Sequence, residues 1–128
     1  MILDEFHATV ASLTGSVALV SVSGELDLYT SERLQHAIGE AHSVGADMVF
    51  LDLSGVAFID STALGVIVQE SKRLEGRGLS LVLVTNDPRT LRVLEVTGLD
   101  RSLRRHATLH DALRAHVPEA ENIVPGVA

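Results

Sequence analysis

Hydrophobic and polar positions alternate near the amino terminus of the chain. Residues 6–13 alternate loosely, Thr14-Gly15 follows as a turn, and Ala18, Val20 and Val22 then occupy every second position. A period of two is typical of a strand with one buried face. The pattern therefore predicts a β-hairpin at the start of the domain.

The next segment changes to a helical period. Thr30 or Ser31 can cap the start of a helix here, and Gly45 can end it. The predicted helix carries one apolar stripe, formed by Leu34, Ala37, Ile38, Ala41 and Val44.

Two continuous apolar runs predict strands that are covered on both faces, as in a parallel sheet. The first run is Met48–Leu51, with Leu53 after it, and we expect a loop between this strand and the helix that follows. The second run lies in LSLVLVTN, residues 79–86.

Three further helices follow from periodicity and capping signals. Apolar residues dominate one side of residues 64–74, before Gly76 or Gly78. Asp87-Pro88 combines an N-cap with a proline at the first helical position, and Gly98 ends that helix. Residues 102–106 predict a short edge strand. The last helix begins at Thr108-x-x-Asp111 and places Ala112, Leu113 and Val117 on its apolar side.

The alternation of strands and helices predicts an α/β fold built on a mostly parallel sheet with right-handed crossovers. We expect a single domain over residues 1–117, with a mixed sheet of four to five strands and about four helices. Residues 118–128 contain two prolines and no periodicity, so they predict a flexible tail.

Composition narrows the class of protein. The chain is 46% hydrophobic, has a net charge of −7 and contains no tryptophan and no cysteine. A negative charge argues against direct nucleic-acid binding, and the Arg101, Arg104 and Arg105 cluster is interpreted as a solvated edge. Acidic residues stand where a signal peptide has basic ones, and no apolar run is long enough for a membrane span. We expect a cytoplasmic protein.

Motifs for catalysis and cofactor binding are missing from the sequence. It contains neither a P-loop nor a dinucleotide fingerprint, and Ser61 is not in a G-x-S-x-G elbow. His106 and His110 have a spacing that can hold a metal on one helix, but the predicted helix start at Thr108 separates them. We therefore expect no enzyme activity, no cofactor and no metal.

Polar residues gather where two predicted strands end. Asp27 follows the second strand, and Asp60, Ser61 and Thr62 open the helix after the third. Functional groups in open parallel sheets collect beyond the carboxyl ends of the strands. Spacing alone favours Asp60 or Ser61 as a helix cap. A helix start also tolerates an added anion, so a cap position is compatible with phosphorylation.

Two motifs carry a resemblance to a known family. VSGELDLYTSERL (22–34) and VFLDLSGVAFIDSTALGVIV (49–68) resemble the anti-sigma factor antagonists, which are stand-alone STAS domains. Residues 78–113 match the rest of that domain in order and character, so the resemblance extends from about Phe6 to Val117. The combination of G-E-L-D with I-D-S-T-A-L-G is more specific than either motif alone.

The resemblance implies a partner-switching function in transcription. Members of the family bind an anti-sigma factor, a serine kinase with a GHKL-type ATP site, and thereby free a sigma factor. The kinase inactivates the antagonist by phosphorylation, and a PP2C-type phosphatase reverses the modification. We expect such a protein to be a monomer or a weak dimer, in pathways such as stress response or sporulation.

Carried onto this sequence, the resemblance assigns phosphorylation to Ser61, with Thr62 as the second choice. Asp27 and Asp60 match family aspartates beside the phosphorylated position, and Gly65 matches a family glycine. We expect these five residues to bind the partner. The sequence departs from many members at Ala63, where they have glycine. The alternative function is an accessory STAS domain, without a phosphoswitch, in a stress-signalling assembly or a lipid-transport complex.

Overall fold

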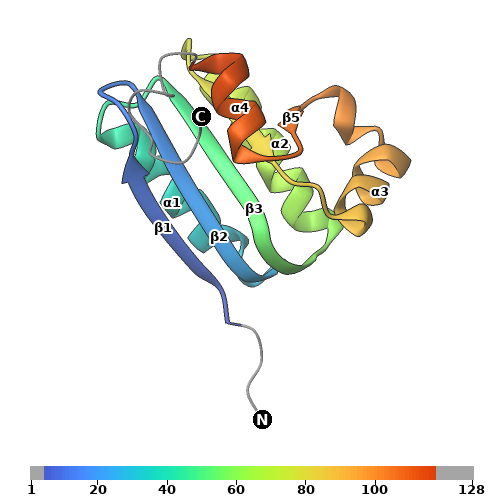
Figure 1. The fold of residues 1–128 in the computed structure, drawn as a ribbon. Coiled ribbons are helices and arrows are strands. Elements are labelled where there is room, and N and C mark those ends of the chain that lie inside the picture. Colours follow the sequence, from blue (N-terminus) through green and yellow to red (C-terminus); the bar gives the residue numbers. More distant parts are fainter. Residues whose placement is uncertain (1–4, 118–128) are drawn as a thin grey trace.

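One mixed sheet organises the chain. The computed structural model describes residues 5–117. The five strands lie side by side in the order in which they occur in the sequence (Figure 1). The first is antiparallel to the second, and all other neighbours are parallel. The mixed sheet and the initial hairpin are therefore confirmed. The strands are β1 (His7–Ser12), β2 (Val17–Leu26), β3 (Met48–Ile59), β4 (Ser80–Val84) and β5 (Arg104–His106).

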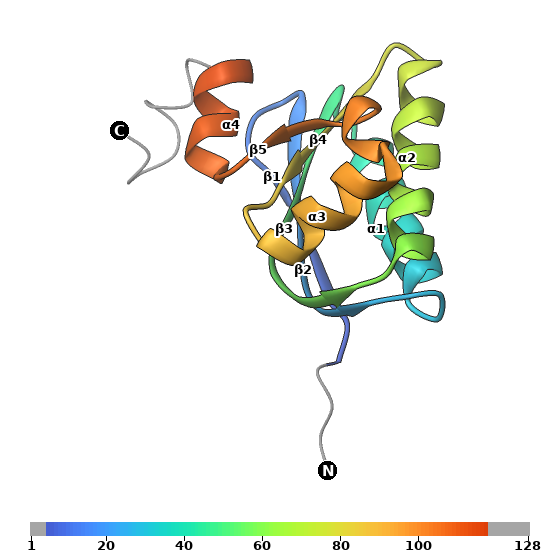
Figure 2. The ribbon, with the colours of Figure 1, turned by 90° about the vertical axis from the view of Figure 1, so that its right-hand side faces the viewer.

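Helices cover both faces of the sheet unequally. Figure 2 shows α1 and α2 on one side of the sheet and α4 on the other. Leu94 of α3 is buried in the same core as α1 and α2. The helices are α1 (Ser31–Ser43), α2 (Ser61–Glu75), α3 (Pro88–Thr97) and α4 (Leu109–His116), and a short 3₁₀ turn, η1 (Leu99–Arg101), follows α3. The number of helices in the described chain agrees with the sequence-based expectation.

The two faces of the sheet contain two separate hydrophobic cores. The larger one lies under α1, α2 and α3 and includes the inward-facing residues of β2, such as Val20 and Val22. The smaller one lies under α4, where Leu113 packs with Phe50 and Val82. On this second face of β3, polar Asp52 and Ser54 follow Phe50, so the apolar part that the eight-residue helix α4 covers is short.

The third strand is longer than the sequence pattern predicts. We expected a loop after Leu53, but residues 54–59 continue β3 and pair with the end of β2. The prediction was wrong because this stretch lacks the continuous apolar run of a buried strand. Two register shifts between β2 and β3, at Ser21/Ser23 and at Gly24/Glu25, accompany the change, and most side chains of residues 54–58 are exposed.

Local capping signals were largely accurate. The Asp87 carboxylate accepts a hydrogen bond of 3.2 Å from the Thr90 amide, and the Thr108 hydroxyl accepts one of 3.0 Å from the Asp111 amide. Gly98 ends α3 in the left-handed conformation, with φ of +76°. The predicted flexible tail, residues 118–128, lies outside the described residues. Within residues 5–117, no helix is long and apolar enough to cross a membrane.

Candidate functional site

The predicted site residues meet at one edge of the sheet. Strand pairing places Leu26 opposite Ile59 at the carboxyl ends of β2 and β3. Asp27 follows the first of these strands directly, and Asp60-Ser61 follows the second. The loop before α1 and the start of α2 therefore begin side by side, as the parallel arrangement predicts.

Asp27 organises the loop between β2 and α1. Its carboxylate accepts hydrogen bonds from the backbone amides of Tyr29 (2.9 Å) and Thr30 (3.0 Å). The Thr30 hydroxyl accepts a 2.9 Å hydrogen bond from the Asp27 amide and lies 3.0 Å from the carbonyl oxygen of Glu25. Ser31, which is buried, donates to the carbonyl oxygen of Leu28. This network fixes the loop without help from a partner.

The network corrects the predicted cap of the first helix. Thr30 occupies the N-cap position of α1, but its hydroxyl makes no capping hydrogen bond with the helix, and Ser31 is already the first helical residue. The Thr30 hydroxyl instead donates to the carbonyl oxygen of Glu25 at the end of β2, and the Ser31 hydroxyl donates to that of Leu28 in the loop. The Asp27 carboxylate satisfies the free amides ahead of the helix, so a residue expected only to bind a partner also stabilises the fold.

Asp60, not Ser61, caps α2. The Asp60 carboxylate accepts a 2.8 Å hydrogen bond from the Ala63 amide, which is the geometry of an N-cap. Ser61 and Thr62 are the first two helical residues and both are exposed. Neither side chain forms a hydrogen bond with another residue of the described range 5–117. The first turn of α2 contains no acidic residue, and the Asp60 carboxylate at the cap accepts from the Ala63 amide, which leaves the other amides of the first turn beside Ser61.

Gly65 lies one helical turn after Ser61, on the same side of α2. It is half-buried, and a Cβ atom at this position would meet nothing within 4 Å. Packing within the domain therefore does not require glycine here, although glycine in a helix costs about 1 kcal/mol relative to alanine. The missing side chain leaves backbone accessible next to Ser61.

Exposed apolar side chains flank the two site segments along the chain. Leu28 and Tyr29, in the loop that Asp27 holds, are 61% and 87% exposed, and Phe58, near the end of β3, is 50% exposed. Sequence reasoning missed all three. A signal was present in the apolar pair Leu28-Tyr29, which stands in a loop between polar residues. We call Leu28, Tyr29 and Phe58 the apolar trio; large apolar side chains grouped on a surface are typical of protein interfaces.

Charge is distributed unevenly between the two halves of the sheet. Residues 5–70 contain nine acidic residues and a single lysine or arginine, Arg33, whereas residues 71–117 contain nine lysines and arginines and five acidic residues. The site lies within the acidic half. A partner with a basic surface would therefore be attracted to this side of the domain.

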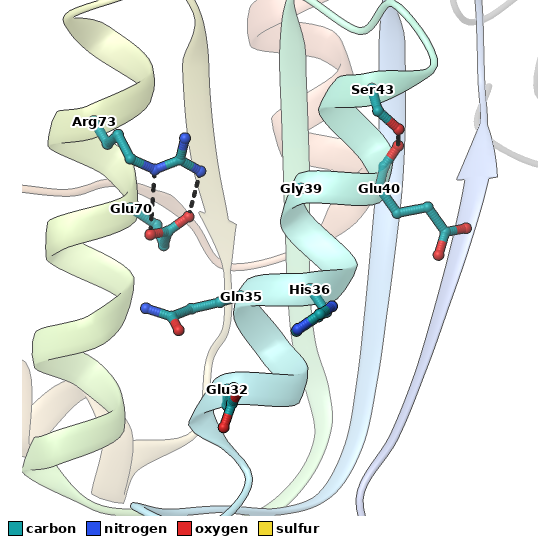
Figure 3. Close-up of a pocket in the computed structure, with 8 residues that line it drawn as sticks. All are labelled: Glu32, Gln35, His36, Gly39, Glu40, Ser43, Glu70 and Arg73. Atoms are coloured by element: carbon teal, nitrogen blue, oxygen red, sulfur yellow. Dashed lines mark hydrogen bonds and ion pairs between the residues drawn. The ribbon is translucent and has the colours of Figure 1, made fainter.

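A groove between α1 and α2 lies apart from the predicted site residues (Figure 3). On the α2 side of the groove, buried Glu70 forms an ion pair with Arg73 at 2.7 Å, and Gln35 extends toward this pair from α1. The hydrogen bond and the charge of Glu70 raise the pKa of Arg73 above its usual value. This pair satisfies its own charges, so the groove offers no free cation for an acidic ligand. Within residues 5–117, no group of three or more metal-ligating side chains converges.

Comparison with known proteins identifies the family. Residues 8–112 match the sequence profile of the STAS domain. The chain is 36% identical over 110 residues to "Anti-sigma-F factor antagonist RsfB" of Mycobacterium tuberculosis, covering 86% of this chain and 88% of RsfB. It is 40% identical over 81 residues to an "Anti-sigma-B factor antagonist" of Listeria monocytogenes, covering 62% and 70%.

A solved structure agrees with these matches. The crystal structure of an anti-sigma factor antagonist from Mycobacterium paratuberculosis superposes with a TM-score of 0.77 at 34% identity, covering 88% of this chain and 94% of that one. The protein belongs to the STAS domain family of anti-sigma factor antagonists, and the resemblance drawn from the two sequence motifs is confirmed.

Proposed function

We propose that the protein is a partner-switching regulator of transcription. Its unphosphorylated form binds an anti-sigma factor, a serine kinase of the GHKL type, and so releases a sigma factor. Phosphorylation of Ser61 by that kinase ends the binding, and a PP2C-type phosphatase restores it. The observation that carries the proposal is an exposed serine at a capped helix start, which the Asp60–Leu26 hydrogen bond joins to the ordered loop that presents Leu28 and Tyr29.

The arrangement of the site supports a binding surface that is formed before the partner arrives. Asp27 and Thr30 fix the loop that presents Leu28 and Tyr29, so little conformational entropy remains to be lost there on binding. The backbone at Gly65 leaves room for close approach on the other side of Ser61. Relatives whose names describe antagonists of anti-sigma factors support the choice of partner.

A phosphate on Ser61 suits a switch that leaves the domain folded. The helix start tolerates the added anion, because the amides of the first turn and the helix dipole favour negative charge. The same phosphate adds about −1.5 to −2 charges to the surface proposed to bind the partner. Burying it there would cost desolvation, and the carboxylate of Asp60 lies next to it in the chain. Binding is therefore lost while folding is kept.

Calorimetry with the cognate anti-sigma kinase tests the proposal. Ser61→Ala is expected to bind like the unphosphorylated protein, and Ser61→Glu to lose binding while melting at the wild-type temperature. Equal affinities of Ser61→Glu and wild type would contradict the switch. If neither form binds the kinase, the partner assignment itself is wrong.

Mass spectrometry after incubation with the kinase and ATP locates the modified hydroxyl. Phosphate is expected on wild type and on Thr62→Ala, and not on Ser61→Ala. Incorporation into Ser61→Ala that disappears in the double variant would move the site to Thr62. Removal of the phosphate by a PP2C-type phosphatase then tests the reverse step.

A further inference from the structure

Two histidines far from the proposed switch meet between β5 and α4. The Nε2 atoms of His106 and His116 lie 3.0 Å apart, and the two rings are nearly perpendicular, at 80°. Neither ring is fully exposed. At this distance one ring donates its N–H to the lone pair of the other, which requires that at least one of the two rings is neutral.

The pair stands where the carboxyl-terminal end of α4 meets the sheet. Ala112, Leu113 and Val117 pack on Phe50 and the neighbouring β4 residues, and the Phe50 ring lies 6.2 Å from the ring of His116. Thr108 caps the opposite end of the helix. Because α4 is the helix that buries the smaller core, its attachment decides whether that part of the sheet is covered.

The surroundings of His116 disfavour a positive charge. From β5 it faces His106 and the cation of Arg104, from β3 it faces the uncharged Phe50 ring, and β4 contributes Val82 and Val84 to the same core. Burial, followed by the charges of His106 and Arg104, lowers the pKa of His116. No carboxylate within residues 5–117 counteracts this effect.

We propose that His106 and His116 form an acid-sensitive latch that holds α4 on the sheet while one ring is neutral and releases its end when both rings are protonated. Two imidazolium ions have no lone pair to share, and they repel each other in a half-buried site. Release uncovers Phe50, Val82 and Leu113, an apolar surface opposite the one that carries Ser61. The device is separate from phosphorylation and does not depend on the proposed function.

The direction of the pH dependence follows from proton binding. His116 takes up a proton less readily in the docked state than in the released state, so acid favours release. Docking is complete above the ordinary pKa of histidine, about 6.5, and weakens as the pH falls below it. At neutral pH the latch is closed.

Nuclear magnetic resonance of the full chain, in EDTA so that no metal bridges the rings, tests the latch. Between pH 7.5 and 5, the amide signals of residues 109–117 are expected to shift together with the ring protons of His116, with a midpoint below about 6.5. The amides of α1 and α2 are expected to stay in place. Signals of 109–117 that do not move over this range would overturn the latch in the wild-type protein.

Variants separate the pair from the other histidines. His106→Gln/His116→Gln removes both rings of the pair, whereas His36→Gln removes an exposed histidine of α1 and serves as the matched control. Fluorescence of a dye that binds apolar surface is expected to rise on acidification in wild type and His36→Gln, and to be independent of pH in the double variant. A pH response in the double variant equal to that of wild type would overturn the proposal.

Discussion

The backbone amide of Asp60 donates a hydrogen bond of 3.1 Å to the carbonyl oxygen of Leu26. This bond joins the last residue of β2 to the cap of α2. It fixes the starts of the two site segments to each other, because Asp27 follows Leu26 and Ser61 follows Asp60 in the chain. This backbone contact adds to the pairing of β2 with β3 in holding the ordered loop next to the proposed switch serine.

Loss of the cap at Asp60 should weaken the fold without touching the serine. Asp60→Ala removes the acceptor of the Ala63 amide and is expected to lower the free energy of unfolding by about 1 kcal/mol. Asp60→Asn keeps an acceptor oxygen and is expected to stay close to wild type. Urea unfolding measures both, and equal stability of Asp60→Ala and wild type would show that the cap contributes nothing.

Two glycines should respond to alanine in opposite directions. At Gly24, φ is +91° and a Cβ atom would lie 1.9 Å from the carbonyl oxygen of Glu5, so Gly24→Ala combines a strained conformation, costing about 1–3 kcal/mol, with a backbone clash. Gly39 lies inside α1, where a Cβ atom would meet nothing within 4 Å. Gly39→Ala is expected to raise the free energy of unfolding by about 1 kcal/mol.

Thermal or urea unfolding of both variants checks the pair. A Gly24→Ala protein as stable as wild type would contradict the close approach of residue 5 to β2. Gly39 also lines the groove between α1 and α2. The affinity of Gly39→Ala for the kinase therefore tests whether a methyl group in this groove interferes with binding.

The apolar trio should contribute binding energy and little stability. Tyr29→Ala is expected to weaken affinity for the anti-sigma kinase at least tenfold, about 1.4 kcal/mol, because exposed aromatic side chains are frequent hot spots. Val96→Ala, on α3 and 74% exposed, is the matched control and is expected to bind normally. Calorimetry measures both affinities. Equal losses in the two variants would assign the effect to the fold and not to the site.

Acid should destabilise the cap of α3. Burial favours the neutral form of Asp87, but hydrogen bonds from Thr90 and the charge of Arg89 outweigh it and lower the pKa of the carboxyl group. Its contribution to stability is present above the ordinary pKa of aspartate, about 3.9, and is lost as the pH falls through the lowered value. Asp87→Asn keeps the cap and does not titrate. Its unfolding free energy is expected to fall less steeply below pH 4 than that of wild type, and parallel curves would contradict the assignment.

Signals that lie within a few residues were read correctly from the sequence. Asp87-Pro88 and Thr108 cap helices as predicted, because an N-cap needs only its own side chain and an amide three residues later. The edge strand within 102–106 and the mixed sheet also agree with the pattern. The gathering of Asp27 and Asp60 at one edge followed from the general geometry of parallel strands.

Features that depend on distant neighbours could not be read in this way. The extension of β3 to Ile59 depends on the irregular pairing with β2, which no local pattern reveals. Residue type alone does not decide between Asp60 and Ser61 as the cap of α2, and it favours Thr30 or Ser31 at α1, where the Asp27 carboxylate accepts the hydrogen bonds of the preceding amides. His106 and His116 are ten residues apart on different elements, and only the packing of α4 brings them together.

The order of the strands in space repeats their order along the chain. A ribosome releases the chain from its amino terminus, so each strand emerges when the neighbour that it pairs with has already left the tunnel. Both segments of the site and the helices that they begin lie within residues 5–75. The helix that Ser61 begins packs on β4, so the surface that carries Ser61 is completed on the nascent chain only after β4 has emerged, while β5 and α4 are still being synthesised.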